Sequence, residues 1–141
     1  MICDAAIKYI DTPFAFGGRD STSLDCVGLI LVVIKEEYDI DIKVNYPASI
    51  QYDGGERWKE VFKKRGEIGD LSEGDAVLFS IRRAEIHFGI ITKLSQNEEE
   101  SMFVHANQSI GKVICQRLTN KWKSRIVGVF SMERDNIVWQ H

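Results

Sequence analysis

One cysteine in this 141-residue sequence stands where it could act as a nucleophile. Cys26 directly precedes the apolar run from Val27 to Ile34, which predicts a buried helix that begins at the cysteine. At a helix N-terminus, the helix dipole and the free backbone N–H groups favour the thiolate, which is the nucleophilic form of cysteine. The position therefore predicts a nucleophile. The alternative is a small buried packing residue, the role of most free cysteines.

Two histidines fall on neighbouring predicted strands, at 87–94 and 101–108. Antiparallel pairing of these strands places His87 opposite His105, or two residues out of register and opposite Asn107. In either register an imidazole meets a polar side chain on one face, the arrangement in which a partner orients a general base. Two half-buried histidines bound only to backbone groups are the alternative. A zinc site made of the cysteine and both histidines is less favoured, because no local ligand spacing supports it.

The elements that must position these residues begin with helices. Residues 2–10 carry apolar side chains at helical spacing and predict a short N-terminal helix. The segment after Cys26 predicts a second helix capped by Ser23 or Asp25, although its β-branched cluster makes a buried strand the alternative. A further short helix is predicted near residues 56–64.

The second half of the chain changes to alternating apolar and polar residues. Five strands joined by short loops are predicted, as an antiparallel meander, at 75–81, 87–94, 101–108, 112–118 and 125–132. Helices followed by strands are typical of the α+β class. The length and the 44% content of hydrophobic residues suit one domain that spans residues 1–141.

Composition excludes several classes of protein. The net charge of −3 and the pI of about 5.6, without a basic stripe, argue against a nucleic-acid partner. No apolar run approaches the ~18 residues of a membrane span. The N-terminus lacks the pattern of a secretory signal, which predicts synthesis in the cytoplasm without a signal peptide. Three cysteines without close spacing, and no CxxC or HExxH pattern, predict neither a disulfide framework nor a bound metal or cofactor.

Five short motifs, in order along residues 2–132, resemble the signature of NlpC-type cell-wall cysteine peptidases. The matching segments are TPFAFGG at 12–18, DCVGL at 25–29, EGDAVLF at 73–79, HFGI at 87–90 and FVHA at 103–106. The resemblance implies a papain-like NlpC fold. In this fold the nucleophile stands at a helix N-terminus that packs on an antiparallel sheet of about five strands.

The resemblance also implies a catalytic triad. Cys26 would be the nucleophile, His87 the base and later the acid, and His105 the orienting third member. Such an enzyme is a cysteine endopeptidase that hydrolyses amide bonds in peptidoglycan stem peptides, including γ-D-glutamyl–diamino acid bonds, through a thioester. The sequence from Arg82 to His87 looks most like the phage-tail and gene-transfer-agent branch. The implied partners are therefore wall peptides and phage-like tail proteins, and the implied location is a phage-like particle acting at the cell wall.

Four residues are predicted to contact the substrate: Phe14, Asp25, Val27 and Asn107. The family usually has tyrosine at Phe14 and serine at Val27, so its usual specificity carries over less well than its catalysis. Asp25 resembles the family's amine-binding aspartate and can also cap the helix. Two other functions stay open: a catalytically silent binding or tail-structure module, and a papain-like lipid acyltransferase or hydrolase. An exposed apolar surface near Cys26 would favour the latter.

Overall fold

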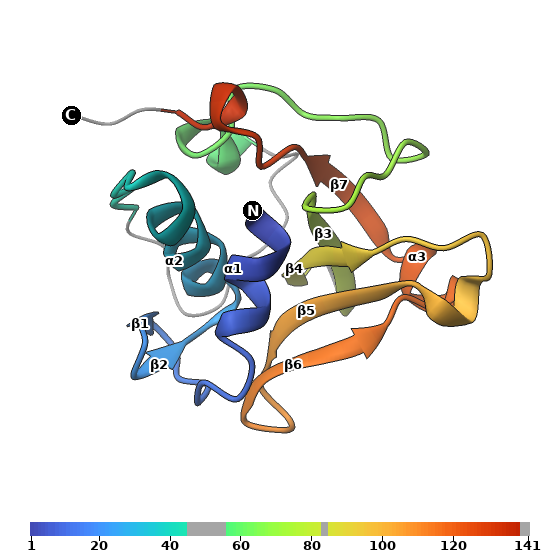
Figure 1. Ribbon diagram of the computed structural model, residues 1–141, viewed down its shortest axis with the longest axis horizontal. Helices are drawn as coiled ribbons and strands as arrows, with labels where there is room; N and C mark the ends of the chain where they lie inside the picture. The colour runs from blue at the N-terminus through green and yellow to red at the C-terminus, as the bar shows by residue number, and fades with distance from the viewer. Residues whose placement is uncertain (45–55, 83–84, 139–141) are drawn as a thin grey trace.

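Two helices cover one face of a five-stranded antiparallel sheet in the computed structural model, which describes residues 1–44, 56–82 and 85–138 (Figure 1). The helices are α1 (Ile2–Lys8) and α2 (Cys26–Tyr38), and the strands are β3 (Ala76–Arg82), β4 (Glu85–Lys93), β5 (Met102–Asn107), β6 (Lys112–Arg117) and β7 (Ile126–Phe130). The remaining elements are a small hairpin of β1 (Arg19–Asp20) and β2 (Ser23–Leu24), the helix α3 (Asn120–Lys123), and three 3₁₀ turns, η1 (Glu56–Glu60), η2 (Glu98–Glu100) and η3 (Arg134–Asn136). The predicted α+β class is confirmed.

The segment after Asp25 forms a helix, as predicted, and not a strand. The Asp25 carboxylate caps it by accepting a hydrogen bond from the backbone N–H of Gly28 at 2.7 Å. Most of the first nine residues of α2 are buried, because the helix packs against both α1 and the sheet. Burying a large aliphatic side chain stabilises a fold by about 1.5–3 kcal/mol. Tertiary packing therefore holds this β-branched sequence in a helix against its local preference.

The strand order, β6-β5-β4-β3-β7, differs from the predicted meander. Consecutive strands are neighbours from β3 to β6, as predicted. The last strand, however, pairs with β3, where Ala76 lies opposite Phe130. The prediction was wrong for β7 because alternation of apolar residues identifies a strand but does not say which edge of the sheet it joins. Placing β7 beside β3 buries Ile126 and Val129 on the face opposite the helices.

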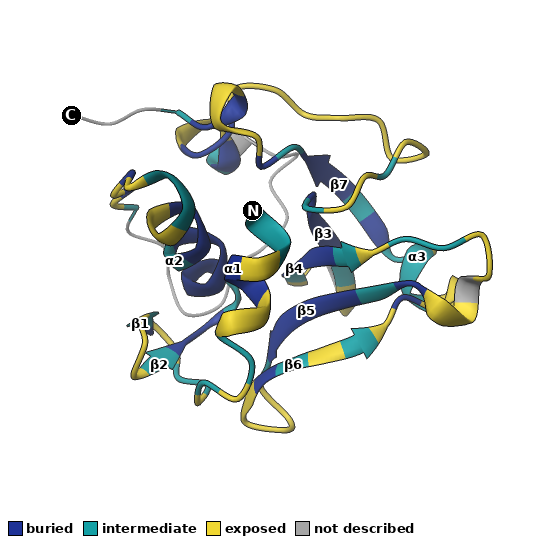
Figure 2. Cartoon of the chain, in the orientation of Figure 1, coloured by how far each residue is buried: buried dark blue, intermediate teal, exposed yellow. Residues whose placement is uncertain are grey.

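Both faces of the sheet are apolar, and each has its own core (Figure 2). Even-numbered residues such as Leu78, Phe88 and Ile90 face the helices. Odd-numbered residues such as Phe79 and Phe103 face a second, smaller core. The two histidines are odd-numbered and therefore lie on the face of this second core. Within the described residues, no helix is long and apolar enough to cross a membrane.

Candidate active site

One cleft of about 800 Å³ is lined by Cys26, His87 and His105 together. It lies where β4 and β5 separate, because the last pair of their ladder on this side is Ile90 opposite Val104. The three predicted catalytic residues come from α2, β4 and β5, and only the tertiary fold brings them into one cleft.

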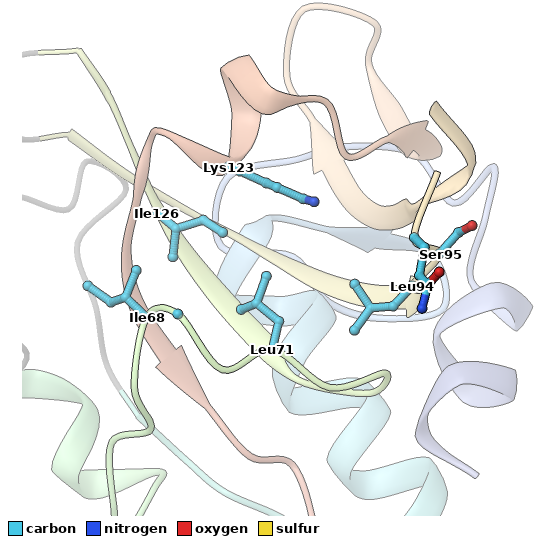
Figure 3. A pocket seen from close by; sticks show the side chains of 8 residues that line it. Ile68, Leu71, Leu94, Ser95, Lys123 and Ile126 are labelled. Carbon is cyan, nitrogen blue, oxygen red and sulfur yellow. The ribbon is translucent and has the colours of Figure 1, made fainter. Parts of the chain in front are cut away.

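A second cavity, of about 530 Å³, lies elsewhere on the molecule (Figure 3). Its labelled side chains are mainly aliphatic: Ile68, Leu71, Leu94 and Ile126, with Ser95 and Lys123 at its edge. Its lining contains no cysteine, histidine or carboxylate. The cleft around Cys26 is therefore the candidate active site.

Cys26 is held in place by the loop that precedes it. It is the first residue of α2. Gly28, two residues later, packs so closely on the loop that a Cβ atom there would lie 1.9 Å from the carbonyl oxygen of Gly18. The same carbonyl accepts a hydrogen bond from the backbone N–H of Asp25. The two glycines thus allow the loop and the helix start to touch, and this contact fixes the position of the thiol.

Asp25 fastens the same loop through both of its carboxylate oxygens. One oxygen accepts from the Gly28 N–H and forms an ion pair with Arg19, and the other accepts from the Gly17 N–H at 2.8 Å. The residue is buried at 8% exposure, yet it contributes to the cleft lining. The structure therefore shows that Asp25 holds the loop and caps α2, whereas its contact with a substrate remains a prediction.

The two histidines form a direct side-chain contact. Nε2 of His87 lies 2.7 Å from Nδ1 of His105. Extended towards the cleft, the β4–β5 register would place His87 opposite Asn107, the second of the two predicted registers. The imidazoles nevertheless meet, because diagonal neighbours on two strands lie within reach of long side chains.

The hydrogen-bond chain continues to a residue that the sequence analysis missed. Nε2 of His105 lies 2.8 Å from Oε1 of Gln116 on β6. The signal was present, because the hairpin that pairs Asn107 with Lys112 brings Gln116 diagonally next to His105 on one face. Since both ring nitrogens of His105 have hydrogen-bond partners, the residue would have to give up one of these hydrogen bonds to bind zinc. Among the described residues, no group of three or more His, Cys, Asp or Glu side chains is placed to hold a metal ion.

Burial away from water is the largest cause of the pKa shifts in the site. Burial raises the pKa of Cys26 to about 11, although hydrogen bonds from the backbone N–H groups of Phe88 and Val27 act in the opposite direction. Burial, together with repulsion from His105, lowers the pKa of His87 to about 3. Burial also lowers the pKa of His105, against the effect of its hydrogen bond to Gln116. These shifts favour a neutral thiol beside neutral imidazoles near pH 7.

The hydrogen bond from Phe88 also locates the sulfur relative to His87. Phe88 follows His87 directly on β4, so its N–H brings the sulfur of Cys26 against the strand that carries this histidine. Beyond Ile90 this strand has no ladder partner on β5, which leaves the Phe88 N–H available to the sulfur. The end of the β4–β5 ladder therefore accounts for both the cleft and the position of the Cys26 sulfur beside β4.

The other predicted substrate contacts also line the cleft. Phe14 is half-buried and meets Phe16 edge to face, with 5.2 Å between ring centroids. Val27 is 2% exposed, so it forms part of the wall. Asn107 accepts a hydrogen bond from the backbone N–H of Ile110 at 2.9 Å, which shapes the turn after β5. All three positions are consistent with contact to a bound molecule.

Charged side chains stand at the rim of the cleft. Arg82 lies opposite Glu85 in the β3–β4 pairing, so this cation and this carboxylate face each other. Arg125 lies over the ring of Trp122, with 5.2 Å between its guanidinium carbon and the ring centroid. The ring in turn contacts His105 at 5.5 Å between centroids. Arg125 thus gives the histidine end of the cleft a positive charge that Trp122 holds in place.

Comparisons with known proteins identify the family of the chain and its fold. The profile of the NlpC/P60 family matches residues 11–131. The NlpC/P60 domain of the peptidoglycan hydrolase SagA superposes with a TM-score of 0.64 at 20% sequence identity, over 92% of this chain and 95% of that chain. An NlpC/P60 family protein from Bacillus cereus ATCC 10987 gives 0.62 at 17% identity, over 92% of this chain and 40% of that chain.

NlpC1 from Trichomonas vaginalis also gives a TM-score of 0.62, at 14% identity, over 93% of this chain and 42% of that chain. No curated protein sequence matches the chain significantly. The family profile covers most of the chain, and the solved structures share its fold. The chain therefore belongs to the NlpC/P60 family of cysteine peptidases.

Proposed function

We propose that this protein is a cysteine peptidase that hydrolyses amide bonds in the stem peptides of bacterial peptidoglycan. The observation that carries the proposal is the joint placement of Cys26 and the hydrogen-bonded pair His87 and His105 in one cleft. Family membership supports a peptidase, and the related SagA domain belongs to a peptidoglycan hydrolase.

The proposed reaction begins with the transfer of the thiol proton of Cys26 to His87. The sulfur then attacks the amide carbonyl carbon. The backbone N–H of Cys26, which occupies the first helical position where a helix has no internal acceptor, donates to the developing oxyanion. His87 returns the proton to the leaving amine, and a thioester remains on the sulfur. Water, activated by the same histidine, hydrolyses the thioester and restores the thiol.

Purified peptidoglycan provides the direct test, with released peptides measured by mass spectrometry. Hydrolysis by the starting protein and none by Cys26→Ala, with equal circular dichroism and thermal stability, is the expected result. Cys115→Ala is the matched control, because Cys115 is an exposed cysteine on β6 and lies outside the cleft lining. Undiminished hydrolysis by Cys26→Ala would refute the proposal. No hydrolysis by the starting protein would favour the silent binding module.

The proposal also covers which bond the protein cleaves and where it acts. Cleavage between γ-D-glutamate and a diamino acid follows from the family resemblance, and synthetic stem peptides with one γ-linked and one α-linked bond test it. Association with a phage-like particle, which would bring the protein to the cell wall, follows from the motif ending at His87. Co-sedimentation with such particles supports this setting, and recovery only of free protein opposes it.

Exposed apolar side chains favour a second candidate, hydrolysis or transfer of lipid acyl groups. Phe16 is 54% exposed and Ile81 is 43% exposed, and both line the cleft that contains Cys26. Nitrophenyl esters of increasing chain length separate the two functions. A rate that rises from two to twelve carbons and exceeds the rate on wall peptides favours the lipid substrate, whereas a preference for wall peptides favours the peptidase.

A further inference from the structure

Gln116 ends a chain of hydrogen bonds that begins at the proposed base. On β6 it lies opposite Phe103 and two residues from Ile114, the residue opposite His105, so its side chain shares a face with the histidine. Its Oε1 lies 2.8 Å from Nε2 of His105. An amide oxygen carries no hydrogen and can only accept. Nε2 of His105 must therefore carry the hydrogen of this bond.

This single assignment fixes the proton on the next ring. A neutral imidazole has one N–H, so with Nε2 protonated the Nδ1 atom of His105 is an acceptor. That atom lies 2.7 Å from Nε2 of His87, which must then be the donor. The hydrogen of His87 is therefore on Nε2, and its Nδ1 carries a lone pair. Both histidines are neutral near pH 7, because burial lowers the pKa of each.

We propose that Gln116 is a positioning residue that sets the tautomers of both histidines and leaves Nδ1 of His87 free to accept the thiol proton of Cys26. If the Gln116 amide were turned to present its NH₂ group, every assignment would reverse. His87 would then carry its hydrogen on Nδ1 and have no free nitrogen for the thiol proton. The catalytic consequence rests on the proposed function, whereas the positions of the protons do not.

The proton movements balance along this chain. The S–H bond of Cys26 breaks and an N–H bond forms at Nδ1 of His87. The resulting imidazolium keeps its Nε2–H bond directed at His105, which in turn donates to the Gln116 oxygen. The amide oxygen is a very weak base, so it stabilises the positive charge without taking the proton. The proton stays on His87, from which the leaving amine can receive it.

Three substitutions test the assignment. Gln116→Met keeps a long unbranched side chain but removes the acceptor, and Gln116→Glu keeps an acceptor at the same position. Gln96→Met makes the same chemical change at an exposed glutamine that lines the second cavity and not the cleft. Long-range ¹H–¹⁵N spectra of protein with ¹⁵N-labelled histidine report the tautomers, and hydrolysis of peptidoglycan peptides reports kcat and KM.

The starting protein should show Nε2–H on both His87 and His105. In Gln116→Met, His105 should populate both tautomers, and kcat should fall by about tenfold at nearly constant KM. This loss is smaller than the roughly 10⁴-fold effect of a wrongly oriented base in serine proteases, because Gln116 acts through a second ring. Gln116→Glu should keep the tautomers and most of kcat, and Gln96→Met should match the starting protein.

Two results would overturn the assignment: Nδ1–H on His87 in the starting protein, or unchanged tautomers and kcat in Gln116→Met. The spectra need no substrate, so they separate this assignment from the proposed function. The expected tautomers, altered in Gln116→Met, together with no hydrolysis by any variant, would refute the peptidase function and still support the role of Gln116 in placing the protons.

Discussion

Replacing Gly28 by alanine tests how the thiol is positioned. A Cβ atom at this position would lie 1.9 Å from the carbonyl oxygen of Gly18, whereas ordinary contacts begin near 3.4 Å. The obstructing atom is backbone, and a hydrogen bond from Asp25 holds it, so it cannot turn aside as a side chain would. The loop or the start of α2 must therefore move by more than 1 Å.

The stability change follows from three opposing effects. Alanine in place of glycine stabilises a helix by at most about 1 kcal/mol. Overpacking costs about 1–3 kcal/mol, and a rigid obstructing atom places Gly28→Ala at the upper end. Disturbing the Asp25 cap costs about 1 kcal/mol more. We expect a net loss of about 3 kcal/mol, which for a chain of this size lowers Tm by about 10 °C.

Activity should fall further than stability alone explains. A displacement of about 1 Å at a reacting group can reduce the rate about 100-fold. Urea denaturation and hydrolysis of peptidoglycan peptides at 20 °C, where the variant stays folded, measure the two effects separately. Gly69→Ala is the matched control, because a Cβ atom there meets no atom within 4 Å. Equal stability and equal kcat for the two variants would refute the reasoning.

Three further predictions concern the charges of the cleft. With its pKa near 11, Cys26 has a thiolate fraction at pH 7 about 300-fold below that of an exposed thiol. A thiolate of higher pKa is a stronger nucleophile, which offsets part of this difference. Iodoacetamide should therefore label Cys26 about 20-fold more slowly than an exposed thiol, with a rate that rises through pH 9–11. A fast plateau below pH 6 that His87→Ala removes would instead indicate a standing ion pair. Asp25→Ala should lower the free energy of unfolding by about 1–2 kcal/mol in urea, through loss of the helix cap, and an unchanged midpoint would contradict that role. Arg125→Gln should lower kcat/KM about tenfold or more for peptides with a free carboxylate beside the scissile bond, because charge-assisted hydrogen bonds contribute about 1.5–3 kcal/mol. An equal loss of kcat/KM on the amidated peptide would contradict a contact between Arg125 and the carboxylate.

The sequence alone identified most of the elements and three residues that meet in the cleft. Apolar spacing predicted α1 and α2, and alternation predicted the five strands, because both patterns record which face of an element is buried. The position of Cys26 before an apolar run predicted its place at the start of α2. The shared face of His87 and His105 followed from the two-residue period of a strand, and their contact at 2.7 Å agrees with it.

Tertiary structure alone decided the features that depend on distant segments. The pairing of β7 with β3 and the contact between Gly18 and Gly28 depend on how the chain folds back on itself, which local patterns do not give. Strand periodicity could place Gln116 on the face of His105, but only the register of β5 and β6 brings the two side chains into contact. The pKa of Cys26 is the sharpest case. Local reasoning from the helix dipole predicted a favoured thiolate, whereas burial in the folded cleft raises the pKa of the thiol to about 11. The helix terminus is a local property of the chain, but removal from water is a property of everything that packs around the sulfur, and here the second effect is the larger.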